Sequence, residues 1–317
     1  MSGHGGNGVT AATGKSPKTA NLNLYGGWKA ALPFLLPSLI GFVVFFLIPT
    51  VRGIYLSFTD WNLIANSGEF IGGDNYDRLI NDPLFWNAVR VTAWYVTLNI
   101  ISQTILAILI AVAMDRLTKS ATIRSVILLP YLIPNVVVAL IFVWLLNSQL
   151  GIIADLLGFF GVESNYFAGT DAVIPTIAGI NTWRHMGYTA LLIFAGLQTI
   201  PKSLYEAAAL DGATEWQMLR RITIPLLRPV LALVLVITVI GSFQVFDTVQ
   251  VATGGFGGRP GGPGDSSRVI YVYIYELAFV RNELGRSSAI AVALLAFLMV
   301  VTFFQLKILR AGESDLA

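Results

Sequence analysis

The chain contains six apolar runs, each close to the 20 or so residues that a helix needs to cross the hydrocarbon core of a bilayer. The runs are residues 30–50, 91–114, 125–147, 172–200, 229–246 and 287–306. A segment in lipid must satisfy its own backbone hydrogen bonds, so all six are predicted to be helices. Only 12% of the residues are charged, which also favours lipid as the solvent. The sequence therefore predicts an all-α integral membrane protein with six transmembrane helices.

The Lys and Arg residues are distributed unevenly between alternate connections of these runs. The connections on the N-terminal side carry 12 of them, the opposite side carries 7, and Arg184 lies inside the fourth run. Cytoplasmic connections are the ones enriched in Lys and Arg. Both termini, and the connection between the fourth and fifth runs, are therefore predicted to be cytoplasmic.

The two ends of the chain are predicted to be tails. Residues 1–27 are rich in Gly, Ser, Thr and Asn, which is typical of a disordered segment, and residues 311–317 form a short C-terminal tail. No signal peptide is expected, because the first apolar run is too long and begins too late. Gly8–Ser16 resembles a phosphate-binding loop, but five residues separate its glycines where that motif has four. ATP is therefore expected to bind another chain.

Several kinds of chemistry are excluded by composition. The chain has no Cys, and its two His residues are His4 and His185, so disulfides, thiolate sites and multi-His metal sites are not expected. A net charge of +2 without a dense Lys/Arg cluster argues against nucleic-acid binding. We expect no catalytic centre, no metal and no cofactor in this chain.

The connection at 201–225 is unusually polar and prone to form helices. Pro201 suits the first turn of a helix, residues 203–210 are strong helix formers, and Asp211-Gly212 is a turn signal before a second helical stretch at 213–222. The three consecutive alanines at 207–209 would let another surface approach closely. An amphipathic helix lying on the membrane is an alternative, although alanines are weak membrane anchors. The pattern favours a helical hairpin that docks onto a cytoplasmic partner.

This hairpin resembles the EAA loop found in permease subunits of binding-protein-dependent ABC importers. The matching residues are Glu206, Ala207, Ala208, Asp211, Gly212, Ala213, Ile222 and Pro225. The stretches AGLQTIPKSLYEAAALDGA (195–213) and GSFQVFDTVQVATGG (241–255) resemble the carbohydrate-uptake branch of that family. The resemblance covers about residues 30–309. The Gly-rich stretch 253–264 departs from the compact turn usual in the family, so its geometry in the outer loop is open.

The resemblance implies a mechanism and a set of partners. Residues 28–310 would form the six-span permease domain, with a coupling loop at 201–225. Glu206 would pair with a basic residue in a cleft of a cytoplasmic ATPase subunit, and Gly212 would allow the turn. The implied assembly contains a second homologous permease, two ATPase subunits that bind ATP and Mg²⁺, and an extracytoplasmic solute-binding protein. The implied location is the cell (inner) membrane of a bacterium or archaeon.

Polar residues inside the fourth and fifth runs are the candidates for a solute pathway, because such residues are costly in lipid. Helical spacing places Asn181, Arg184, His185 and Tyr188 on one face, and Gly241 and Gln244 on another, with Asp247 near the outer end. Aromatic rings and amides suit a sugar or oligosaccharide. A polyol or glycerol 3-phosphate is an alternative solute. Structural alternatives are open as well: Arg184 and His185 could pair with a partner subunit or reach the interface, and Gln103 and Asn135 could hydrogen-bond between helices.

Two other classes of protein fit the sequence less well. A membrane enzyme would need a nucleophile, a metal cluster or a carboxylate pair, and the runs offer none of these. An ion-coupled transporter or channel would be expected to carry a chain of buried Asp, Glu or His residues, whereas only Arg184 and His185 lie deep. The sequence favours a permease subunit without its own chemistry.

Overall fold

The computed structural model describes residues 27–118, 120–162, 165–254 and 261–309. Within these ranges the chain is mostly helical and contains no strand, only isolated bridges such as Thr59 with Phe70, so the all-α prediction is confirmed there. The predicted tails fall outside the described residues, except that Gly27 already begins the first helix. The phosphate-loop-like segment and residues 255–260 of the Gly-rich stretch fall outside them too.

The chain divides into two compact units, residues 1–52 and 53–317. The first unit contains α1 (Gly27–Phe42), a π-helical turn η1 (Val43–Leu47) and the start of α2 (Ile48–Leu56). Together they form one continuous apolar helical stretch whose large side chains are exposed. That pattern is typical of a helix that faces lipid.

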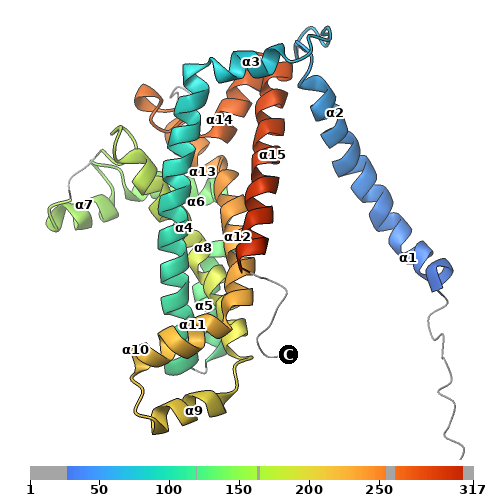
Figure 1. The fold of residues 1–317 in the computed structure, drawn as a ribbon. Coiled ribbons are helices and arrows are strands. Elements are labelled where there is room, and N and C mark those ends of the chain that lie inside the picture. The colour runs from blue at the N-terminus through green and yellow to red at the C-terminus, as the bar shows by residue number, and fades with distance from the viewer. Residues whose placement is uncertain (1–26, 119, 163–164, 255–260, 310–317) are drawn as a thin grey trace, which may run out of the picture. The chain divides into compact units, whose positions relative to one another are not determined.

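Two long helices form the centre of the second unit (Figure 1). They are α4 (Pro83–Leu117) and α8 (Val173–Leu197), which pack along each other, with α12 (Arg228–Phe243) against both and α15 (Leu284–Leu309) against α12. Small residues allow the close approach: Ala107 and Ala111 of α4 and Ala190 of α8 are fully buried in one cluster. Asp82 caps α4 by accepting a hydrogen bond from Leu84 N, and Pro83 occupies its first turn.

Two helical stretches of the second unit are sharply bent. α5 (Ala121–Leu132) and α6 (Asn135–Leu145) meet at 91°, and the segment 215–226 meets α12 at 73°. Prolines lie at both breaks, where the missing N–H and the ring of proline interrupt a helix. By length and composition, three helices could cross a membrane, or up to five if each bent pair is one span. α8 is not among them, because Asn181, Arg184 and His185 lower its hydropathy.

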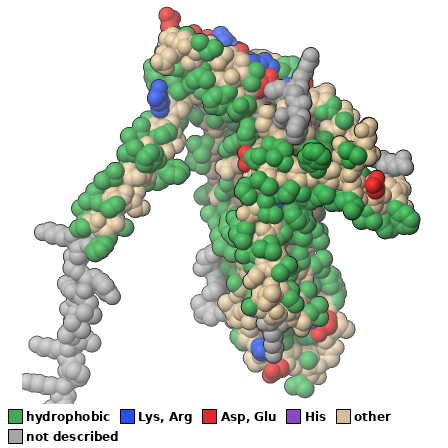
Figure 2. Space-filling model, turned by 180° about the vertical axis from the view of Figure 1, so that it is seen from behind, with side chains coloured by type: hydrophobic (Ala, Val, Ile, Leu, Met, Phe, Trp, Pro, Cys, Tyr) green, Lys and Arg blue, Asp and Glu red, His purple; other side chains and the backbone are tan. Residues whose placement is uncertain are grey.

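Short helices occupy the two ends of the second unit. One end carries α9 (Lys202–Leu210), α10 (Glu215–Met218) and α11 (Ile224–Leu226) (Figure 1). The π-helical turn η2 (Leu219–Thr223) lies between α10 and α11. The opposite end carries α3 (Asp74–Ile80) and α14 (Ile270–Tyr275). The remaining short elements are α7 (Ile152–Phe159), α13 (Asp247–Val249), η3 (Gln250–Gly254), η4 (Pro263–Asp265) and η5 (Glu276–Val280). On the face seen in Figure 2, charged side chains gather mainly at the two ends, and apolar side chains cover most of the middle.

A buried ionic network holds the end near α3 and α14. Asp82 accepts hydrogen bonds from Arg286 Nη2, at 2.6 Å, and from the Tyr273 hydroxyl. Glu276 pairs with both Arg268 and Arg281. Burial, and then the hydrogen bond to Asp82, raises the pKa of Tyr273 to about 12, so its hydroxyl stays protonated and donates. This network joins α14 and η5 to the starts of α4 and α15.

Candidate functional site

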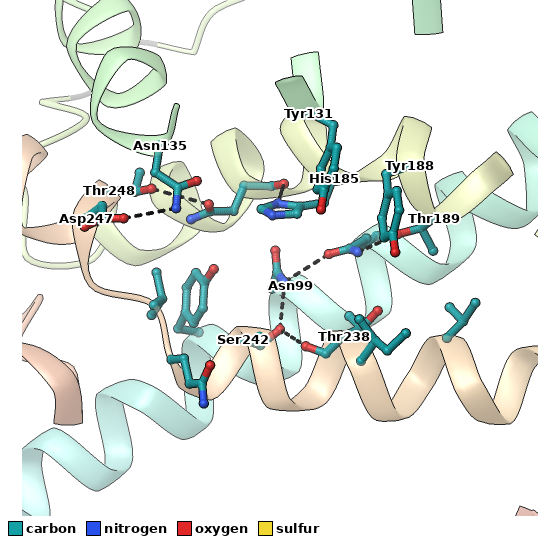
Figure 3. A pocket seen from close by; sticks show the side chains of 18 of the residues that line it. Asn99, Tyr131, Asn135, His185, Tyr188, Thr189, Thr238, Ser242, Asp247 and Thr248 are labelled. Atoms are coloured by element: carbon teal, nitrogen blue, oxygen red, sulfur yellow. Dashed lines mark hydrogen bonds between the residues drawn. The ribbon is translucent and has the colours of Figure 1, made fainter. Parts of the chain in front are cut away.

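A cavity of about 330 Å³ lies among α4, α8 and α12, next to the break between α5 and α6 and the start of α13 (Figure 3). Most of its lining side chains can form hydrogen bonds. The polar lining residues are Tyr95, Asn99, Gln103, Tyr131, Asn135, Asn181, His185, Tyr188, Thr189, Thr238, Ser242, Gln244, Asp247 and Thr248. A polar cavity inside apolar helices can hold a hydroxylated solute or ordered water.

One side of the cavity is a hydrogen-bonded network that joins three helices (Figure 3). Asn99 Nδ2 donates to Ser242 Oγ at 2.9 Å and to Gln103 Oε1 at 3.2 Å. Gln103 Nε2 donates to Thr189 Oγ1 on α8 at 2.8 Å. Gln103 therefore makes a bond between helices, which was the structural alternative for it, and it also lines the cavity. Because these side chains satisfy one another, this wall is organised before any solute binds.

Three of the four α8 candidates line the cavity: Asn181, His185 and Tyr188. His185 Nδ1 lies 2.8 Å from the carbonyl oxygen of Asn181, and His185 Nε2 lies 2.8 Å from Nη1 of Arg184. A carbonyl oxygen can only accept and a guanidinium can only donate. These partners fix the neutral imidazole with its hydrogen on Nδ1.

Arg184 does not line the cavity, and its guanidinium contacts the break between α5 and α6. Its Nε donates to the carbonyl oxygen of Ile133 at 3.0 Å, and its Nη2 donates to that of Tyr131 at 3.1 Å. The break frees these carbonyls from helical partners, so the guanidinium supplies the missing donors. The Tyr131 ring in turn stacks on Tyr188 with centroids 4.4 Å apart. Arg184 thus shapes the cavity wall without lining it.

The fifth-run candidates Gly241, Gln244 and Asp247 all line the cavity. α12 ends at Phe243, three residues before the predicted end of the run, and the chain leaves helical geometry before α13 begins at Asp247. This turn brings the Asp247 carboxylate to the cavity, where its Oδ2 accepts from Asn135 Nδ2 at 3.1 Å. Six of the seven predicted pathway residues therefore share one cavity, and their contact with a solute stays a prediction.

Several lining residues were missed by the sequence analysis, chiefly Tyr95, Asn99, Tyr131 and Ser242. Asn99 and Gln103 stand four apart inside an apolar run, and that spacing was a usable signal for a polar face on α4. Ser242 gave no such signal. Serine hydroxyls inside helices often donate to a backbone carbonyl four residues earlier, as Ser242 Oγ does to the Thr238 carbonyl at 2.6 Å, so a serine in an apolar run does not by itself indicate a cavity.

A second candidate site is the hairpin of α9 and α10. α9 ends in a Schellman motif, because Ala213 N donates to Ala208 O and Gly212 N donates to Ala209 O, with Gly212 at φ +74°. Thr214 and Gln217 then form a capping box that starts α10, two residues later than predicted. The hairpin is thus built with a defined turn.

The motif residues of this hairpin differ in exposure. Glu206, Ala207, Asp211 and Gly212 are exposed, whereas Ala208, Ala213, Ile222 and Pro225 are half-buried. The large apolar side chains of Leu210 and Trp216 are 90% and 66% exposed beside the turn. A hydrogen bond of 2.9 Å between the Tyr205 and Thr223 hydroxyls ties α9 to η2 within the loop, and an ion pair between Arg116 of α4 and Glu215 of α10 joins the hairpin to the bundle. The ion pair therefore connects the hairpin to α4.

Among the residues that the structure describes, no group of His, Cys, Asp and Glu could hold a metal ion.

Comparison with known proteins gives consistent matches. The family model described as "Binding-protein-dependent transport system inner membrane component" matches residues 103–311. A probable ABC transporter permease protein of Bacillus subtilis is 32% identical over 288 residues, covering 89% of this chain and 96% of that protein. A multiple sugar-binding transport system permease protein of Streptococcus mutans is 30% identical over 293 residues, covering 92% and 98%. The crystal structure of a bacterial ABC transporter that imports the acidic polysaccharide alginate is similar with a TM-score of 0.76, at 25% identity, over 89% of this chain and 95% of that one.

Proposed function

Since the chain belongs to the family of binding-protein-dependent transport system inner membrane components, we propose that it is one of two permease subunits of an ATP-driven importer for a sugar or oligosaccharide. The observation that carries the solute class is the cavity of amides, hydroxyls and stacked tyrosines between α4, α8 and α12. Sugars need hydrogen-bond partners for their hydroxyls and flat apolar surfaces for their C–H faces. The name of the Streptococcus mutans relative supports the same class.

As a member of this permease family with apolar helices, the protein is integral to the membrane. We propose that it crosses six times, through the stretch 32–56, α4, α5 with α6, α8, α12 and α15. α8 has 25 residues and is about 37 Å long, which exceeds the hydrocarbon core of ~30 Å. Its low hydropathy is compatible with a crossing, because its polar side chains face the cavity and neighbouring helices. The Lys/Arg asymmetry supports cytoplasmic termini.

Within this proposal, residues 201–225 are the coupling loop that docks into a cleft of a cytoplasmic ATPase subunit. The support is the exposed Glu206 beside the apolar Leu210 and Trp216 on a well-capped hairpin. ATP and Mg²⁺ would be held by two such ATPase subunits. An extracytoplasmic binding protein would deliver the solute at the end of α3 and α14. The same family assignment gives residues 28–310 as the limits of the permease domain.

Purification and reconstitution test the proposed function. An ATPase subunit should co-purify with this chain, and uptake of a sugar into proteoliposomes should require ATP hydrolysis on the coupling-loop side. Uptake driven by an ion gradient without ATP would instead indicate a secondary transporter or channel. Uptake of glycerol 3-phosphate or a polyol in place of any sugar would keep the permease assignment and change the solute.

A further inference from the structure

The cavity carries an unusual balance of charge. Among its lining residues there is no Lys or Arg, and Asp247 is the one carboxylate. The guanidinium of Arg184 contacts His185, one of the lining residues. However, Arg184 does not line the cavity, and each of its three nitrogens already faces a partner in Ile133, Tyr131 or His185. A solute in this cavity therefore meets a carboxylate and no cationic side chain from the described part of the chain.

Two hydrogen-bond acceptors lie together at the end of the cavity near Asp247. The amide nitrogen of Asn135 is already directed to the Asp247 carboxylate, and Oδ1 of Asn135 is buried without a partner among the described residues. A carboxylate and an amide oxygen only accept hydrogen bonds. A solute group placed against these two oxygens must donate, as a hydroxyl does. A phosphate, sulfonate or carboxylate offers only acceptors and adds a like charge.

The opposite wall suits a neutral solute as well. Asn99 donates to both Gln103 and Ser242, and Gln103 donates to Thr189, so that wall presents dipoles of both signs without a net charge. The stacked rings of Tyr131 and Tyr188 add a flat surface beside it. Such a surface packs against the C–H face of a sugar ring without regard to charge.

From this charge balance we infer that the cavity selects uncharged, hydroxyl-rich saccharides over anionic ones, and that Asp247 is the residue that sets this selection. The inference rests on the proposed function and narrows its substrate class. It separates this chain from the alginate importer with the similar fold, whose solute is an acidic polysaccharide.

Saccharide binding to the complete transporter tests the inference, without the binding protein so that only the membrane site is probed. The probes are maltotriose, cellotriose and raffinose, each compared with its uronate made by oxidising the C6 hydroxyls, in saturation-transfer NMR on the transporter in nanodiscs. The neutral sugar that binds best should bind at least tenfold more tightly than its uronate. Asp247→Asn, which keeps the size of the side chain, should reduce that ratio at least threefold. Asp155→Asn removes an equal charge from the exposed α7 and should leave the ratio unchanged.

Two outcomes would overturn the inference, and only the second would also contradict the proposed function. If a uronate binds as tightly as its neutral sugar, or if Asp155→Asn changes the ratio as much as Asp247→Asn, the charge selection is wrong and the sugar permease assignment stands. If no member of the panel binds, neutral or acidic, the sugar cavity of the proposed function fails together with the inference.

Discussion

Arg184 donates from Nε to the backbone carbonyl oxygen of Ile133 at 3.0 Å, across 51 residues of sequence. Ile133 follows the last residue of α5, and α6 begins two residues later at a bend of 91°. A bend of this size leaves carbonyl groups without helical donors, and such groups are costly where water is scarce. The guanidinium of α8 therefore stabilises the shape of a different helix.

Replacing Arg184 by Lys should destabilise the break. Lys keeps the positive charge but lacks the planar fork that serves the Ile133 and Tyr131 carbonyls together. We expect a loss of about 1–3 kcal/mol from one unsatisfied, half-buried carbonyl, seen as a lower Tm of the purified protein. Arg90→Lys, at an exposed position of α4, is the control and should change little. Equal melting temperatures for Arg184→Lys and the unmodified protein would contradict this role.

Gly212→Val should weaken the coupling hairpin, whereas Gly212→Asn should be tolerated. Gly212 has φ +74°, a region that a β-branched residue enters at a cost of about 1–2 kcal/mol and that Asn adopts more readily. No atom lies within 4 Å of an added Cβ, so the penalty comes from the backbone alone. Recruitment of the ATPase subunit should fall in the Val variant while membrane insertion persists. The docking role fails if the Val variant recruits the ATPase normally.

Glu206→Lys tests the charge of the same hairpin. Glu206 is exposed on α9, so reversing its charge should leave the fold intact and repel a basic cleft in the partner. We expect ATP-dependent uptake to be lost and co-purification of the ATPase to drop. Lys202→Glu reverses a charge at the start of the same helix and is the matched control. Similar losses in both variants would show that the effect is not specific to Glu206.

Most helices of the second unit could be predicted from the sequence, because a run of about 20 apolar residues predicts a helix that crosses lipid. α4 nevertheless begins at Pro83, eight residues before its run, since Asp82 and Pro83 form a helix start that hydropathy does not detect. Pro130 and Pro134 disfavour a straight helix between α5 and α6. The bend of 91° is supported by a hydrogen bond from Arg184 of α8. The sequence of residues 121–145 alone contains no sign of that donor.

The candidate cavity was predictable one helix at a time. Spacing placed Asn181, His185 and Tyr188 on a common face, and they share the cavity. Arg184 was grouped with them, yet consecutive residues point about 100° apart on a helix, so Arg184 and His185 reach different neighbours. The bond from Asn99 to Ser242 joins α4 to α12 across 143 residues, and such pairs emerge only when the helices are packed.

Asp82→Asn should destabilise the end of the second unit near α3. The Asn side chain can still cap α4, so the substitution removes mainly the charge that faces Arg286 and the acceptor of the Tyr273 hydroxyl. Arg286 would then keep a partly buried charge with weaker compensation. A loss of about 1–3 kcal/mol is expected, measured as a lower Tm. Asp77→Asn on the exposed face of α3 should be close to neutral, and equal shifts in both variants would contradict a specific role for Asp82.

Tyr188→Ala combined with Gln244→Ala should change solute handling while leaving assembly intact. Tyr188 supplies one of the two stacked rings, and Gln244 is an exposed amide at the end of α12 that faces the cavity. Losing a stacking surface and an amide should cost about 1–3 kcal/mol of solute binding, which corresponds to a rise in the apparent KM for uptake of roughly 5- to 150-fold. Phe159→Ala removes an equally large ring from the exposed α7 and serves as the control in proteoliposomes with the complete transporter. Because Asn99, Gln103 and Ser242 hold the three helices together independently, the double variant should still recruit the ATPase. An unchanged substrate profile and KM in that variant would remove these two residues from the solute pathway.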